Sequence, residues 1–155
     1  FLIMESKETT TQCRIKFSFR KIHTEQFAII EDAYNEKGEV TLAINTKFSI
    51  NPELREAASH VTINFNCNKS SFLIIQVVCF LRIEEKAWTS WASDAKITIR
   101  ASFATHMIVL TVGTLRGILH SKTEGTIFNR YIVPPVKVTD LVKENIEFIV
   151  DIKKA

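Results

Sequence analysis

The histidines and cysteines are the side chains in this sequence best suited to binding a metal or acting as nucleophiles. The four histidines are spread along the sequence: His23, His60, His106 and His120. None of them has a second histidine at i+4 beside a carboxylate, the spacing that marks a metal-binding helix. His106 and His120 can share one helix, but at ~1.5 Å per residue they lie about 21 Å apart. We therefore expect no metal site and interpret the histidines as solvated or packing residues.

The cysteines and the remaining candidate nucleophiles do not indicate an enzyme. Cys13, Cys67 and Cys79 are odd in number and lack C-x-x-C spacing, which favours a reducing compartment over a disulfide or zinc framework. Cys67 and Cys79 lie in or beside predicted strands, where a buried inert thiol is the usual outcome. The sequence contains neither a G-x-S-x-G motif nor a glycine-rich phosphate loop. We expect no catalytic residues, no cofactor and no enzymatic activity.

Length and composition indicate one globular domain. The chain has 155 residues, of which 46% are hydrophobic and 24% charged. Its net charge is only +3, and without a dense basic run a nucleic-acid partner is not expected. The apolar start stops at Glu5, far short of a signal sequence, so we expect a cytoplasmic protein. Residues 1–11 are expected to be disordered, ahead of a single domain over residues 12–155.

The elements that must position any site begin with an antiparallel sheet. Apolar and polar residues alternate with a period of two in four segments, the pattern of half-buried strands. The predicted strands are 15–30, with a bend in the middle, 40–50, 61–65 and 72–83. The last two form a hairpin, and the arm 72–83 is apolar on both faces, so we expect it to be central. A charged loop over residues 31–38 separates the first two strands.

The period then changes, which predicts one long helix over residues 103–122. Its apolar arc is far wider than a surface helix needs, and a row of small residues follows it at steps of four. The row is Ala101, Thr105, Val109, Gly113, Gly117 and Ser121. Arg100, His106 and Arg116 leave no uncharged run of ~20 residues, so membrane insertion is not expected.

The row of small residues predicts a homo-oligomer. A sheet can cover only one face of the helix, and small residues let a second backbone approach the other face. The predicted interface residues are Val109, Gly113, Gly117 and Ser121. An ordinary core helix is the alternative.

The segments around the helix are less regular. Residues 88–91 are left as a connecting segment of uncertain structure, and residues 96–100 are left ambiguous between a strand and the start of a helix. Gly125 is expected to end the long helix, and Pro134 and Pro135 exclude a helix just after it. Thr139 or Asp140 can cap a last short helix, and alternation over residues 146–152 then favours a terminal strand.

The order of these elements resembles the SecB family of export chaperones and its SecB-like relatives. The resemblance runs from about Gln12 to Leu141, and its most specific part is the end of the helix and the segment that follows. Ile15 to Ile22 and Phe27 to Ile29 resemble the family's first strand, and Glu31 to Gly38 resemble its crossover loop. The later strands are matched by Val40 to Phe48, Val61 to Phe65 and Phe72 to Ile83. The end of the helix and the segment after it are matched by Leu119 to Gly125 and Pro134 to Leu141.

The resemblance implies an α+β fold, a four-stranded antiparallel sheet followed by a long helix, assembled as a dimer of dimers into a homotetramer. It also implies an ATP-independent holdase that binds unfolded polypeptides through apolar grooves. Matching the family's crossover loop and post-helix segment gives six peptide-binding residues: Phe27, Tyr34, Phe128, Tyr131, Leu141 and Val142. Tyr34 and Phe128 are expected to be surface contacts, and the buried or exposed state of Trp88 and Trp91 is left open.

The alternatives that remain differ in the partner that the protein would bind. Lys137 stands where the family usually has Asn, the chain is mildly basic, and no acidic tail follows the last predicted helix. Holding of unfolded clients, in export or for one dedicated client such as an antitoxin, is therefore expected ahead of docking to the SecA motor. The rival from another class is a small-ligand carrier or enzyme with a cavity between sheet and helix.

Overall fold

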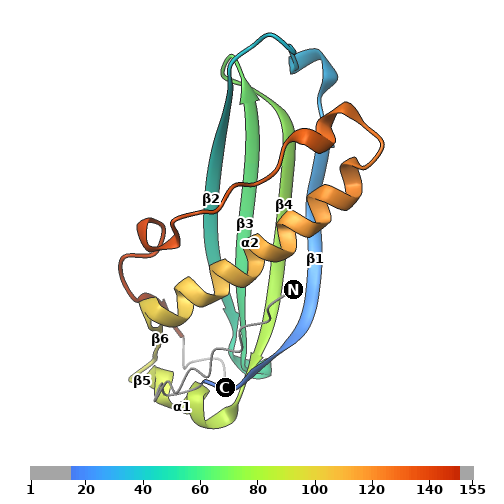
Figure 1. Cartoon of the computed structure of the whole chain (residues 1–155). Coiled ribbons are helices and arrows are strands. Elements are labelled where there is room, and N and C mark those ends of the chain that lie inside the picture. The colour runs from blue at the N-terminus through green and yellow to red at the C-terminus, as the bar shows by residue number, and fades with distance from the viewer. Residues whose placement is uncertain (1–14, 151–155) are drawn as a thin grey trace, which may run out of the picture.

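The main sheet has four antiparallel strands in the order β1-β4-β3-β2 (Figure 1). The structure, a computed structural model, describes residues 15–150, so the expectations for residues 1–11 and Cys13 lie outside it. The strands are β1 Phe17–Ile29, β2 Val40–Asn51, β3 Glu56–Cys67 and β4 Ser70–Ile83. The predicted hairpin is β3 with β4, closed by Asn68 and Lys69 at positive φ angles of 49° and 71°. As expected, β4 is central.

Two helices follow the sheet. Helix α2, Ala101–Thr123, lies diagonally across one face of the sheet, and Gly125 ends it at a φ angle of 78° (Figure 1). Together with the sheet it makes the predicted α+β fold. Helix α1, Glu85–Trp91, resolves the ambiguous segment, and Trp88 and Trp91 are buried there rather than exposed. By length and composition alone α2 could cross a membrane, but here it packs on the sheet as a core helix.

A second, small sheet closes one end of the molecule. Strands β5 Ala92–Ser93, β6 Lys96–Ile99 and β7 Ile146–Ile149 are antiparallel, in the order β5-β6-β7. The predicted terminal strand is therefore confirmed. The prediction of a last short helix capped by Thr139 or Asp140 is wrong. Val138–Asp140 form a single 3-10 turn, and the chain then extends to pair with β6. Asn145 accepts a hydrogen bond from the backbone amide of Ala101 at 2.9 Å, which ties this extended chain to the start of α2.

We call residues 126–142, which run back along α2 over the sheet, the return segment (Figure 1). It contains the 3-10 turns Ile127–Arg130 and Val138–Asp140. One link to α2 is the side chain of Arg116, which donates hydrogen bonds to the carbonyls of Val133 at 2.8 Å and Pro134 at 3.2 Å. The return segment covers some of the sheet that α2 leaves open (Figure 1).

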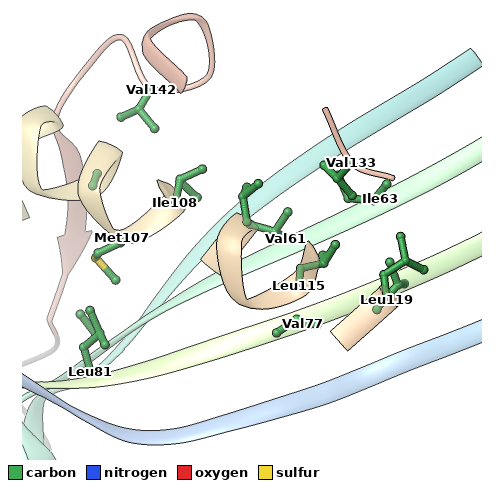
Figure 2. Packing of buried hydrophobic residues seen from close by; sticks show 14 of the residues in the cluster. Val61, Ile63, Val77, Leu81, Met107, Ile108, Leu115, Leu119, Val133 and Val142 are labelled. Carbon is green, nitrogen blue, oxygen red and sulfur yellow. The ribbon is translucent and has the colours of Figure 1, made fainter. Parts of the chain in front are cut away.

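The two faces of the main sheet differ in composition. The helix-side face carries fully buried aliphatic residues such as Ile63, Val77 and Leu81. In Figure 2, Leu81 lies near Met107 and Val77 near Leu115 of α2, while Ile63 lies beside Val133 of the return segment. We call the opposite face the open face, because within residues 15–150 no helix or return segment crosses it (Figure 1). Since paired residues in antiparallel strands share a face, the register places largely polar rows there. Two of these rows are Asn45–Thr62–Gln76–Gln26 and Lys47–His60–Val78–His23.

Candidate functional site

An aromatic cluster joins the loop after β1 to the return segment. The ring of Tyr34 lies 4.9 Å from that of Phe72, 5.0 Å from Phe128 and 6.0 Å from Tyr131. Phe72 and Tyr131 are 5.1 Å apart, and most of these rings meet edge to face or tilted. The structure therefore brings Tyr34 together with Phe128 and Tyr131, which lie more than 90 residues later in the sequence; all three were predicted as peptide contacts.

Polar groups lock the outer rim of this cluster. The hydroxyls of Tyr34 and Tyr131 lie 2.8 Å apart, and Arg130 donates a hydrogen bond to the Tyr34 hydroxyl. Arg130 also stacks over the Tyr131 ring at 5.3 Å and approaches Glu36 within 4.0 Å. Burial, followed by the hydrogen bond to Tyr34, raises the pKa of Tyr131. The Tyr131 phenol is therefore neutral at pH 7, so it keeps the proton it needs as a donor.

Two of the six predicted contacts are core residues instead. Phe128 is 5% exposed and Val142 is 7% exposed, and both belong to the buried cluster. Phe128 is turned inward because Thr126 accepts the Phe128 amide hydrogen bond at 3.2 Å and starts a 3-10 turn there. The expectation that Phe128 is a surface contact is therefore wrong. Tyr34 and Tyr131 are only partly buried.

The other predicted contacts are spread along the molecule. Figure 2 shows Val142 near Ile108, whereas Val133 lies near Leu119 at the other half of α2. Leu141 and Val142 therefore sit far from the aromatic cluster. Phe27 lies on β1, where the Lys122 ammonium is 5.2 Å from its ring centre. The six residues do not form one continuous surface.

A groove of about 440 Å³ opens between α2 and the return segment, and its wall is mostly apolar. Its lining residues are Gly113, Arg116, Gly117, Leu119, His120, Asn129, Tyr131 and Ile132. A Cβ atom built on Gly113 or Gly117 would meet nothing within 4 Å, so the small residues leave this space open to solvent. Tyr131 thus contributes to the groove and to the aromatic cluster, and Ile132 on the rim is 62% exposed.

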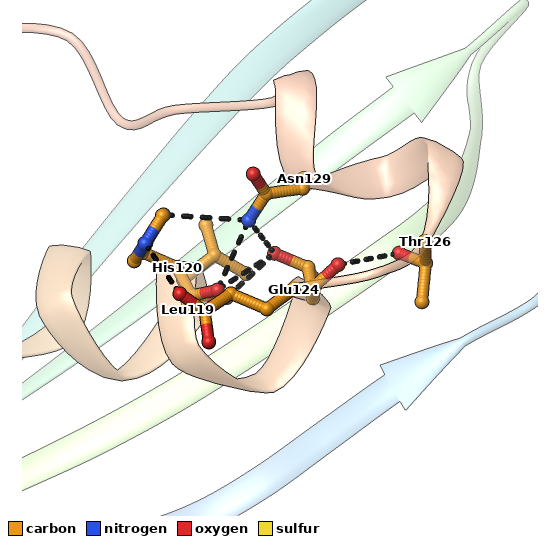
Figure 3. A network of polar contacts seen from close by, with 6 residues as sticks. Leu119, His120, Glu124, Thr126 and Asn129 are labelled. Carbon is orange, nitrogen blue, oxygen red and sulfur yellow. Dashed lines mark hydrogen bonds and ion pairs between the residues drawn. The ribbon is translucent and has the colours of Figure 1, made fainter.

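A polar network fixes the shape of the groove (Figure 3). The Asn129 amide donates to the carbonyl of His120 at 3.0 Å and to the hydroxyl of Thr123 at 3.1 Å, while His120 pairs with Glu124 at 3.0 Å. The Thr126 hydroxyl donates to the Thr123 carbonyl at 2.7 Å. These bonds satisfy carbonyls at the C-terminal end of α2 and hold the return segment at a fixed distance from the helix.

The row of small residues is exposed on α2, as an interface between copies would require. Val109 is 49% exposed, and Gly113, Gly117 and Ser121 are also exposed. On β1, Phe19 and Ile22 are 46% and 47% exposed and lie on the same side of the sheet as α2. The described chain thus presents apolar surface both on α2 and beside it.

Comparison with known proteins adds no family assignment: no protein-family model matches the sequence, and no curated protein matches it significantly.

The groove could not be predicted from the sequence because its two walls come from different segments. Gly113, Arg116, Gly117 and His120 share one face of α2 at helical spacing, but Asn129 reaches them only because the chain reverses direction after Gly125. The one signal available was the pair of glycines in an otherwise apolar helix, which the sequence analysis assigned to an oligomer interface alone.

Proposed function

We propose that this protein is an ATP-independent, SecB-like holdase, which keeps unfolded polypeptides from aggregating in the cytoplasm. The observation that carries the proposal is the open, mostly apolar groove between α2 and the return segment. A holdase must accept many sequences, and an apolar wall recognises them with little polar readout. Ile132, which lines the groove and is 62% exposed, adds to this apolar surface.

Unfolded segments of a client would lie in the groove, with an apolar side chain over Gly113 and Gly117. Burial of ~300 Å² of apolar surface at about 25 cal/mol per Å² gives roughly 7 kcal/mol before the cost of ordering the client is subtracted. One groove would therefore bind weakly. Several grooves on one oligomer gain affinity for a long client through effective concentration.

The oligomer in this proposal is a homotetramer, a dimer of dimers, assembled through Val109 and Ser121, the residues of the exposed row on α2 that do not line the groove. Val109 tests it, because this residue belongs to the row but does not line the groove. In Val109→Glu, light scattering should report a smaller mass, since a charge would be buried between copies. An unchanged mass would remove this face of α2 from the interface.

The functional test is refolding of a slow-folding reporter from denaturant, followed by light scattering. The parent protein should suppress aggregation without ATP, and Ile132→Asp should lose much of this effect because it places a charge on the groove rim. Ile149→Asp is the matched control, since Ile149 is 89% exposed on β7, outside the groove. Equal loss in both variants, or no suppression by the parent at molar excess, would contradict the proposal.

A small-ligand carrier is not favoured by the packing between sheet and helix. Met107, Ile108 and Leu115 fill this layer and are fully buried, so they occupy the place that such a cavity would need (Figure 2). Docking to the SecA motor is not part of the proposal, and neither is the identity of the client.

A further inference from the structure

A chain of polar side chains crosses all four strands on the open face. The Gln76 amide on β4 donates to Glu25 on β1 at 2.6 Å. The second carboxylate oxygen of Glu25 lies 3.9 Å from Nδ1 of His60 on β3. Nε2 of His60 lies 2.9 Å from the hydroxyl oxygen of Ser49 on β2. Ser49, His60 and Glu25 therefore lie side by side, with the imidazole between the hydroxyl and the carboxylate.

The sheet register explains this meeting. Lys47 pairs directly with His60, and Ser49 lies two residues further along β2, so its side chain shares the open face with His60. Glu25 lies at a shift in the β1 register, between Thr24, which pairs with Val77, and Gln26, which pairs with Gln76. An extra residue of this kind re-aims its side chain, and here it lets the carboxylate approach His60.

The environment of His60 suits a general base. Its side chain is 13% exposed, and burial lowers its pKa, with Lys47 acting in the same direction and Glu25 against it. Val78 and Gln76 of β4 lie between His60 and β1, and His23 follows Val78 in the same row. The imidazole is therefore neutral at pH 7, so Nε2 can accept the Ser49 proton when Nδ1 carries its own proton toward Glu25.

We propose that Ser49, His60 and Glu25 form a nucleophile, a base and a positioning carboxylate that accept acyl groups from activated esters. The Ser49 oxygen forms a bond to the acyl carbon while its proton moves to Nε2 of His60. The bond from the acyl carbon to the leaving oxygen then breaks, and His60 returns the proton to that oxygen. Water repeats the two steps to release the acid and free Ser49. Lys47, which pairs with His60 across β2 and β3, brings a positive charge near the imidazole.

The experiment follows p-nitrophenyl acetate hydrolysis and, by mass spectrometry, labelling of the full chain with a serine-directed fluorophosphonate. The parent should be labelled at Ser49, and Ser49→Ala should lose the label and slow hydrolysis about 100-fold, the lower end for such catalysis. Ser71→Ala is the control, because Ser71 donates to Asn66 at 2.6 Å and contacts no histidine in the described chain. It should leave both readouts unchanged.

A pH profile separates positioning from folding. Hydrolysis should rise with pH through the pKa of His60, which burial places below the usual value of about 6.5. Glu25→Gln removes the charge that raises this pKa, so the midpoint should move to lower pH and the rate should fall. The proposal would be overturned if Ser49 were not labelled, or if Ser49→Ala hydrolysed the ester as fast as the parent. If the midpoint of the pH profile did not move in Glu25→Gln, the role assigned to Glu25 would be wrong. None of these readouts depends on holdase activity.

Discussion

The two faces of the main sheet come from the same strands but differ in almost every property. On β3, Val61 and Ile63 point to the helix side and are fully buried. Their neighbours Thr62 and Asn64 point to the open face and are only partly buried. Val61 and Ile63 contact other apolar side chains, although Ser59 on the same face hydrogen-bonds to Thr111 of α2. The open-face residues Ser49, His60, Glu25 and Gln76 meet mainly through polar groups.

This difference indicates which residues stabilise the fold and which can serve a functional site without much loss of stability. Each large aliphatic side chain buried under α2 contributes about 1.5–3 kcal/mol, and a well-packed layer tolerates little change. An exposed polar side chain contributes far less, because water competes for its hydrogen bonds. Substitutions on the two faces should therefore have effects of different size.

The largest expected loss of stability comes from the return segment, which packs on the helix-side face of the sheet. Phe128→Ala should lower the free energy of unfolding by about 3–5 kcal/mol, because it empties the centre of the aromatic cluster. Urea denaturation measures it. Tyr34→Phe, which keeps the ring and loses only the hydroxyl bonded to Tyr131, should cost much less. A Phe128→Ala protein as stable as the parent would show that the return segment does not cover the core.

The sharpest comparison uses two neighbours on β3. Ile63→Ala should cost about 2–5 kcal/mol, since Ile63 is fully buried on the helix side. Thr62→Ala on the open face should cost clearly less, about 1 kcal/mol or below, because Thr62 is only partly buried. Both values come from urea denaturation monitored by circular dichroism. Equal losses would mean that something covers the open face in solution.

The smallest expected effect is the pH dependence due to His60. Because burial lowers its pKa in the folded state, the unfolded chain binds the proton more readily. The free energy of unfolding should therefore be highest above about pH 6.5 and fall as the pH is lowered through the folded-state pKa. His60→Gln should reduce this fall in denaturation curves measured at pH 7.5 and pH 5. A parent and variant with the same slope would contradict it.

The sequence predicted the elements with a strong period and left their meeting points open. Alternation over residues 40–50 and the helical period over residues 103–122 each have one interpretation, so β2 and α2 were predicted within a few residues. Thr139 and Asp140 look equally good as helix caps, and only pairing with β6 decides that the chain extends after them. The helix and strand propensities of a short segment do not indicate which distant strand it will pair with.

The candidate sites depend on register and chain reversal, which composition does not encode. Tyr34 was predicted as a contact and lies at the rim of the aromatic cluster, but Phe128 could not be told from a surface residue without the 3-10 turn that directs it inward. Ser49, His60 and Glu25 lie on three different strands, and one residue more or less in β1 would move the carboxylate away. A histidine far from any motif therefore gave no sign of its partners.

The strand order β1-β4-β3-β2 also sets the sequence of events as the chain leaves the ribosome. Strands β2, β3 and β4 follow one another and can pair as a meander as soon as each is made. The first strand has no such neighbour: Phe17 must wait for Ile83, and Ile29 for Leu73. During that delay the apolar face of β1 is exposed and its backbone is unpaired, and closing so long a loop slows the last step of sheet formation. A protein proposed to shield unfolded chains is thus itself, early in synthesis, a chain in need of shielding.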